Sequence, residues 1–194
     1  MTTANKISLF RIFLVPVFIV EVLYYVQTGV ELHRVVAIVS FAIASVSDGV
    51  DGYIARRFNQ RSPLGAILDP LADKLLLVSG IILLSFDQSP HLPRLPLWLA
   101  GTILSREVLL LMGMMVIHYT CGKVKVHAAW IGKAATVLQM ACILWALLKW
   151  QGAWLFILSL AAAACTGISA ILYLTSGIRQ LAASPSSAAD GKQG

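Results

Sequence analysis

Four aspartates within 26 residues have the side chains and the spacing of a divalent-metal site. Asp48 and Asp51 are three residues apart, and Asp69 and Asp73 are four residues apart. On helices, these spacings place both members of each pair on one face. Oxygen ligands without a neighbouring His or Cys favour hard cations, so the pattern predicts Mg²⁺ or Mn²⁺ binding. Such ions commonly complete their coordination with substrate phosphates, which indicates chemistry on a phosphate ester.

Small residues accompany the first aspartate pair. Gly49, Gly52 and Ala55 recur every third residue and leave a strip poor in side chains, against which a bulky nucleotide could lie. Arg56, at the end of the strip, could bind a diphosphate through two parallel hydrogen bonds. Ordinary helix packing is the alternative for the small residues, and it is the commoner use of such residues in membranes.

The elements that carry these residues are predicted to be transmembrane helices. Hydrophobic residues make up 58% of the chain and charged residues 12%, which is far from the balance of a globular protein. An unpaired carboxylate is costly in a bilayer, so the aspartates must face a polar interior, counter-charges or an ion. The fold class we expect is an all-α integral membrane protein with six transmembrane helices. The six apolar stretches are approximately 8–28, 35–56, 66–86, 96–118, 129–149 and 153–176.

The second and third stretches are expected to be antiparallel neighbours. The short segment between them contains Ser62, Pro63 and Gly65, which favour a turn. The two aspartate faces can therefore converge, and we expect the active site at the cytosolic side.

The basic residues predict the orientation. The net charge of +6 could indicate nucleic-acid binding, but the basic residues stand mostly at helix ends and in short loops, so we expect no nucleic-acid partner. With cytosolic termini, nine basic residues fall inside and three outside, as the positive-inside rule requires. The outer three are Arg34, Arg94 and Lys149. We expect the protein to lie in the bacterial inner membrane, with membrane lipids around it. We also expect one membrane domain over 1–181, followed by a disordered tail over 182–194.

The aspartate segment resembles the signature of the CDP-alcohol phosphatidyltransferase family at every fixed position. Members of this family are similar in size and helix number, and are usually homodimers, so the resemblance implies a homodimer here. It also implies that Asp48, Asp51 and Asp69 bind the metals, that Asp73 is the general base and also a ligand, and that Gly65 permits close helix approach. The matching positions are Asp48-x2-Asp51-Gly52-x2-Ala55-Arg56-x8-Gly65-x3-Asp69-x3-Asp73, of which Gly52, Ala55, Arg56 and Gly65 would form the CDP site.

Two further segments resemble the phosphatidylglycerophosphate synthases of that family. One is the Arg106-Glu107 pair, and the other is Lys133 with the Thr136 and Gln139 that follow it. The resemblance implies CDP-diacylglycerol and glycerol 3-phosphate as substrates, with Arg106 and Lys133 binding the acceptor phosphate. Alternatives remain for both residues: Arg106 could be a structural partner of Glu107 or extend towards the interface, and Lys133 could serve topology alone.

Other functions fit the same carboxylates less well. Cardiolipin synthases and phosphatidylinositol phosphate synthases share the family signature, so the acceptor stays open between these enzymes. An intramembrane prenyltransferase would need two widely separated aspartate motifs, and this chain has one compact group. A cation transporter would not need the intervening Gly52, Ala55 and Arg56.

Overall fold

The structure, a computed structural model, describes residues 3–58, 63–86, 91–121, 130–150 and 152–182. Its side chains are described over a smaller part, namely 9–47, 72, 74–86, 91–113, 115–116, 130–150 and 152–178. In these residues the chain forms six helices close to the predicted stretches, with α6 reaching Ala182. The helices are α1 (Thr3–Thr28), α2 (Glu31–Phe58), α3 (Pro63–Ser85), α4 (Leu97–Cys121), α5 (Trp130–Leu147) and α6 (Ala153–Ala182).

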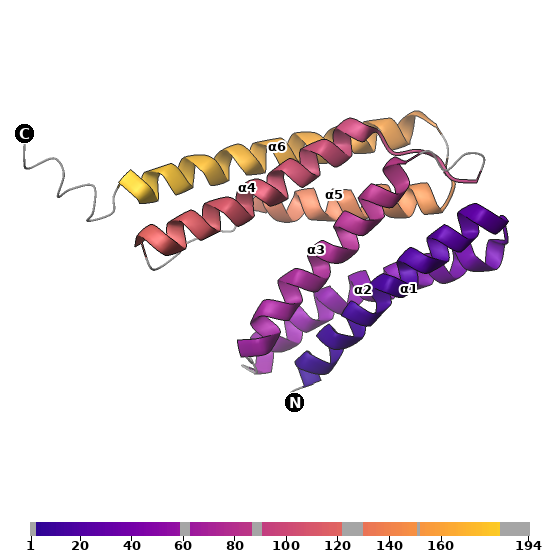
Figure 1. Ribbon diagram of the computed structural model, residues 1–194, viewed down its shortest axis with the longest axis horizontal. Helices are drawn as coiled ribbons and strands as arrows, with labels where there is room; N and C mark the ends of the chain where they lie inside the picture. The colour runs from indigo at the N-terminus through magenta and orange to yellow at the C-terminus, as the bar shows by residue number, and fades with distance from the viewer. Residues whose placement is uncertain (1–2, 59–62, 87–90, 122–129, 151, 183–194) are drawn as a thin grey trace, which may run out of the picture.

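The helices form two groups that α3 connects (Figure 1). Helix α1 packs on α2 and α3, whereas α4 and α5 both pack on α6. Helix α3 also contacts α2, α4 and α5, so it lies between the two groups. A residue halfway along α3 can therefore reach side chains that are distant in sequence.

Large apolar side chains fill the interior, and small residues bring helices close together. Phe18 of α1 and Phe41 of α2 are buried, with ring centroids 5.4 Å apart. At Gly80 of α3 an added Cβ would lie 2.9 Å from a methyl group of Ile143 on α5, so glycine permits that approach. Small buried residues also line the α5–α6 interface, where close van der Waals packing replaces the hydrophobic effect inside a membrane. They include Ala135, Cys142, Ala146, Ser159 and Ala162.

Three segments among the described residues are long and apolar enough to cross a bilayer: Leu9–Thr28, Trp130–Leu147 and Ala153–Ile178. Helix α4 differs because Arg106 and Glu107 lie near its middle. The spans and the many exposed apolar side chains indicate a membrane protein. Six membrane crossings remain a prediction.

The connections α1–α2, α3–α4 and α5–α6 meet at one end of the molecule, at the right in Figure 1. Gly29 ends α1 with φ +69°, and an added Cβ there would lie 2.9 Å from the His91 ring of the α3–α4 connection. Glycine is required at this position both by its left-handed backbone and by the close approach.

Ion pairs and hydrogen bonds to Glu31 connect side chains at this end of the molecule. Glu31 pairs through Oε2 with Arg34 Nε (2.6 Å) and through Oε1 with Lys149 Nζ (2.9 Å). Tyr25 also donates its hydroxyl to Glu31 Oε1, at 3.2 Å. The hydrogen bond from Lys149 lowers the pKa of Glu31, and hydrogen bonds to Tyr25 and Glu31 raise the pKa of Lys149. Arg34 and Lys149, two of the three basic residues predicted to be outside, thus share one carboxylate.

Candidate active site

Helices α2 and α3 carry the four aspartates at matching heights. Asp48 lies ten residues before the end of α2, and Asp73 lies ten residues after the start of α3. Asp51 and Asp69 lie seven and six residues from those same helix ends. At 1.5 Å of rise per residue, Asp48 and Asp73 are each about 15 Å from the α2–α3 connection, and Asp51 and Asp69 are each about 10 Å from it. On two contacting antiparallel helices, the aspartates therefore form two levels.

The metal and nucleotide sites remain predictions at the level of side chains. The side chains of all four aspartates, and those of Gly52, Ala55, Arg56 and Gly65, lie outside the described residues. The described residues alone contain no group of three or more His, Cys, Asp or Glu that could hold a metal ion. The backbone positions of the four aspartates on α2 and α3, by contrast, are those that the sequence spacing predicts.

The residue that follows Asp73 begins a described polar cluster. Lys74 Nζ lies 2.6 Å from Glu107 Oε2 on α4. The other oxygen of Glu107 accepts a hydrogen bond from Arg106 Nη1 at 2.7 Å. One carboxylate therefore connects a lysine of α3, next to a predicted metal ligand, with an arginine of α4.

Arg106 is buried, and residues of α4, α5 and α6 lie around its guanidinium. Its Nη2 donates to Ser169 Oγ of α6 at 3.4 Å. A Cβ added to Gly132 of α5 would lie 3.3 Å from Nη2, so this glycine leaves the space for the guanidinium. Only 9% of Arg106 is exposed, and its Nε has no hydrogen-bond partner among the described residues. A buried donor without a partner is costly, which suggests that a ligand completes this site.

The cluster surrounds a cavity of about 150 Å³ between α3, α4 and α5. Its polar lining consists of Lys74, Arg106, Glu107, Thr136 and Gln139, and Leu77, Val78, Ile103 and Leu110 complete the wall. The two cations and one carboxylate give the lining a net charge of +1. Such a cavity suits a small anion that also carries hydroxyl groups.

Gln139 is fixed in this wall by a buried hydrogen-bond chain. Its Nε2 donates to Thr166 Oγ1 at 2.9 Å, and the Thr166 hydroxyl donates to the Ala162 carbonyl at 2.6 Å. Both residues are buried, so the chain fixes α5 against α6 at the depth of the cavity.

Lys133, the second predicted acceptor residue, does not line the cavity. Its side chain is exposed, and Nζ lies 5.6 Å from the centroid of the Trp130 ring, which is itself exposed. This cation–π contact fits a residue near the membrane interface. The structure therefore brings Arg106 to the cavity but leaves Lys133 outside it.

The sequence did not single out several residues of this site. The contacts of Lys74, Gly132 and Ser169 at this site join helices that are distant in sequence, and a linear pattern does not show such contacts. Thr136 and Gln139 were noted for their resemblance alone. A polar Gln139 between apolar residues of a predicted membrane helix was a signal that could have placed it.

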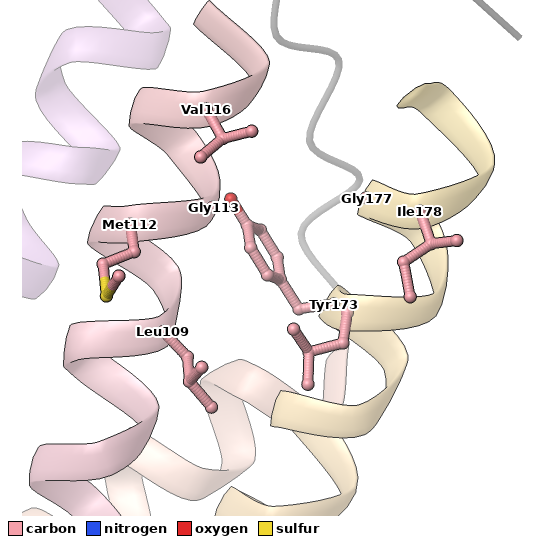
Figure 2. A pocket seen from close by; sticks show the side chains of 8 residues that line it. Leu109, Met112, Gly113, Val116, Tyr173, Gly177 and Ile178 are labelled. Carbon is pink, nitrogen blue, oxygen red and sulfur yellow. The ribbon is translucent and has the colours of Figure 1, made fainter. Parts of the chain in front are cut away.

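A second cavity, of about 230 Å³, opens between α4 and α6 (Figure 2). Tyr173 extends from α6 towards Gly113 of α4, and a Cβ on that glycine would lie 3.0 Å from the ring. The other lining residues are apolar, including Leu109, Met112 and Ile178. This groove offers van der Waals contacts rather than charge, so the polar cavity is the better candidate for binding an anion.

Comparison with known proteins agrees with the aspartate pattern. A family model described as CDP-alcohol phosphatidyltransferase matches residues 1–168. Proteins of Salmonella typhimurium strain LT2 and Escherichia coli strain K12 are each 33% identical to this chain over 141 residues. Those residues cover 73% of this chain and 74% of each relative. Both relatives are described as CDP-diacylglycerol–glycerol-3-phosphate 3-phosphatidyltransferases.

Proposed function

Because the chain belongs to the CDP-alcohol phosphatidyltransferase family, we propose that it transfers the phosphatidyl group of CDP-diacylglycerol to glycerol 3-phosphate. The products are phosphatidylglycerophosphate and CMP. The choice of acceptor rests on the cavity around Arg106. One of its lining residues, Lys74, directly follows Asp73 in the chain. The descriptions of the relatives support the same acceptor.

The four aspartates fit a divalent-metal site. All their donor atoms are carboxylate oxygens, and α2 and α3 carry them at two matching levels. Mg²⁺ and Mn²⁺ prefer such ligands, so Asp48, Asp51, Asp69 and Asp73 would hold the metal. When bound, the metal supplies charge stabilisation at the diphosphate.

The residues of the chain have separate tasks in the transfer. The acceptor hydroxyl oxygen forms a bond to the phosphatidyl phosphorus, the bond from that phosphorus to the CMP oxygen breaks, and Asp73 takes the hydroxyl proton. Gly52, Ala55, Arg56 and Gly65 bind the CDP portion, with Arg56 on the diphosphate. Lys74, which follows Asp73, also faces the acceptor cavity and so connects the two parts of the site.

The cavity favours a small phosphorylated alcohol. Arg106 supplies directed N–H donors for a phosphate, and Thr136 and Gln139 supply polar groups for the hydroxyls of the acceptor. A volume of about 150 Å³ suits a three-carbon phosphate better than an inositol phosphate. Phosphatidylglycerol, the acceptor in cardiolipin synthesis, carries two acyl chains and fits this polar space less well. Lys133, at the rim in this proposal, attracts the incoming phosphate.

The membrane arrangement follows the same proposal. Six helices cross the bacterial inner membrane, with the termini and the aspartate end at the cytosol and the Glu31 end outside. The gathering of three connections at the Glu31 end supports this arrangement. A homodimer, usual in the family, is part of the proposal.

An acceptor panel tests the function. Purified protein with CDP-diacylglycerol and Mg²⁺ or Mn²⁺ should release CMP fastest with glycerol 3-phosphate, compared with inositol phosphate and phosphatidylglycerol. EDTA should abolish the release, and added Mg²⁺ or Mn²⁺ should restore it. Preference for another acceptor would reject the proposed acceptor within the family. Ion flux in proteoliposomes without CMP release would favour a cation transporter instead.

A further inference from the structure

Glu107 occupies a position that the proposed reaction does not yet explain. A carboxylate in an anion-binding cavity repels the ligand unless nearby cations neutralise its charge. Both Glu107 oxygens are engaged, Oε1 by Arg106 Nη1 at 2.7 Å and Oε2 by Lys74 Nζ at 2.6 Å. Its side chain is 14% exposed, so these two cations, rather than water, balance its charge.

We propose that Glu107 is a positioning residue, which orients Arg106 for the acceptor phosphate and fixes that arginine relative to the α3 turn that carries Asp73. The inference rests on the proposed function, because it assigns a role within the same site.

The contacts around the guanidinium show how the orientation arises. A guanidinium has five N–H donors in one plane, so two anchored nitrogens fix the direction of all five. Glu107 holds Nη1 and Ser169 holds Nη2, at 2.7 and 3.4 Å. These two contacts use two of the five N–H donors, so the guanidinium keeps donor capacity for a ligand. Without Glu107, the described side chains would orient the plane only through the long Ser169 contact.

The second contact of Glu107, with Lys74, fixes the position of Arg106 relative to α3. Lys74 is the neighbour of Asp73 on that helix, and its ion pair with Glu107 connects α3 and α4 across the cavity. The phosphate held by Arg106 and the hydroxyl that loses its proton to Asp73 belong to one acceptor molecule. A fixed distance between Arg106 and α3 therefore keeps that hydroxyl within reach of the base.

Glu107 also adjusts the charge of the cavity. Lys74 and Arg106 alone would give +2 and would repel each other. The carboxylate lowers the net charge to +1 and lies between the two cations. A phosphate can then bind without removing either cation from its partner.

The test is the kinetic behaviour of Glu107→Gln and Glu107→Asp, measured as CMP release with each substrate varied in turn. For Glu107→Gln we expect the KM for glycerol 3-phosphate to rise by about 10-fold or more, as for loss of a charged hydrogen-bond partner, with little change in the KM for CDP-diacylglycerol. Glu107→Asp keeps the charge but is one methylene shorter, so it should recover part of the loss.

Glu31→Gln is the matched control, because it removes a carboxylate that also bridges an arginine and a lysine, at the opposite end of the molecule. Its kinetic constants should equal those of the wild type. Thermal unfolding of each variant in detergent gives the folded fraction. If Glu107→Gln does not fold, Glu107→Asp carries the test, with a smaller rise in the same KM.

Two results would overturn the positioning role. One is an unchanged KM for glycerol 3-phosphate in a folded Glu107 variant. The other is an equal rise in the KM values for both substrates that parallels a loss of thermal stability. Normal wild-type turnover of glycerol 3-phosphate together with either result would reject this inference alone. A wild type that uses no phosphorylated acceptor would reject the proposed acceptor, and this inference with it.

Discussion

The protein uses the same arrangement of charges twice, with a carboxylate between an arginine on its own helix and a lysine from elsewhere in the chain. Glu31 bridges Arg34 and Lys149, whereas Glu107 bridges Arg106 and Lys74. The N–O distances are similar, at 2.6 and 2.9 Å for Glu31 and at 2.6 and 2.7 Å for Glu107. The surroundings differ, because the Glu31 side chain is 56% exposed and that of Glu107 is 14% exposed.

Depth decides what each bridge can do. The Glu31 bridge lies where helix connections meet, so water and salt screen it and it contributes little to stability. The Glu107 bridge lies nine residues or more from either end of α4, in a helix surrounded by apolar residues. Charges at such a depth are expensive unless they pair or bind a ligand. Similar contacts thus form a surface ion pair in one place and, in our proposal, part of the acceptor site in the other.

The largest expected effect concerns the proposed metal site, which lies next to the Glu107 bridge (the inner bridge) and not next to the Glu31 bridge (the outer bridge). Asp48→Asn and Asp73→Asn should each reduce kcat for CMP release by at least about 10²-fold, the lower range for loss of a positioned acid–base group. Both proteins should remain folded by thermal unfolding, with Glu31→Gln as the active control. Near-normal turnover by either aspartate variant would contradict its assigned role.

A charge-conserving change at the inner bridge should have the next largest effect. Arg106→Lys keeps the cation but loses the planar set of donors, so it cannot hold Glu107, Ser169 and a phosphate together. The KM for glycerol 3-phosphate should rise by about 10-fold, in line with the loss of a charge-assisted hydrogen bond. Arg34→Lys is the matched change at the outer bridge and should leave that KM unchanged. Equal effects of both variants would remove the distinction between the two bridges.

A single methyl group beside Arg106 should give a smaller effect. A Cβ on Gly132 would lie 3.2 Å from Ser169 Oγ and 3.3 Å from Arg106 Nη2, so the guanidinium must shift by a few tenths of an ångström. Gly132→Ala should raise the acceptor KM by about 3-fold, since hydrogen bonds weaken as their geometry departs from the optimum.

Gly101→Ala is its control on α4, because a Cβ there meets nothing within 4 Å. That control should stabilise the helix by about 0.5–1 kcal/mol and leave the kinetic constants unchanged. A Gly132→Ala enzyme with wild-type acceptor KM would show that Arg106 tolerates displacement.

The smallest effect is expected at the outer bridge and depends on pH. The pKa of Glu31 is lowered by Lys149, so its pairing stabilises the folded state above the ordinary value of 4.5 and is lost as the pH falls through the lowered value. At pH 7, Glu31→Gln should reduce the Tm by no more than about 3 °C, as is usual for exposed ion pairs. As the pH falls from 4.5 through the lowered pKa of Glu31, the difference from the wild type should shrink and then disappear. A difference that stays constant as the pH falls below 4.5 would contradict the pairing.

At high pH the same bridge is lost because Lys149 gives up its proton. The pKa of Lys149 is raised above its ordinary value of 10.5 by Tyr25 and Glu31. Its contribution is therefore fully present below pH 10.5 and disappears as the pH rises through the raised value.

The helices could be predicted from the sequence because each depends on local information. Long apolar stretches separated by Pro, Gly and polar residues predicted six helices, and the structure has six in the described residues. The aspartate spacing placed Asp48 and Asp51 on α2 and Asp69 and Asp73 on α3. Arg106 could be singled out because a charge within an apolar stretch is costly and needs a reason.

The partners of Arg106 were decided only by tertiary structure. Ser169 is 63 residues away in sequence, and Glu107 reaches Lys74 across 33 residues. The rotation of α5 also could not be read from the chain. At about 100° per residue, Lys133 lies about 60° from Thr136 and about 120° from Gln139 around the helix axis. Packing of the small-residue face of α5 on α6 turns Thr136 and Gln139 to the cavity and leaves Lys133 outside it. Local sequence sets which residues share a face, but only packing against other helices decides where that face points.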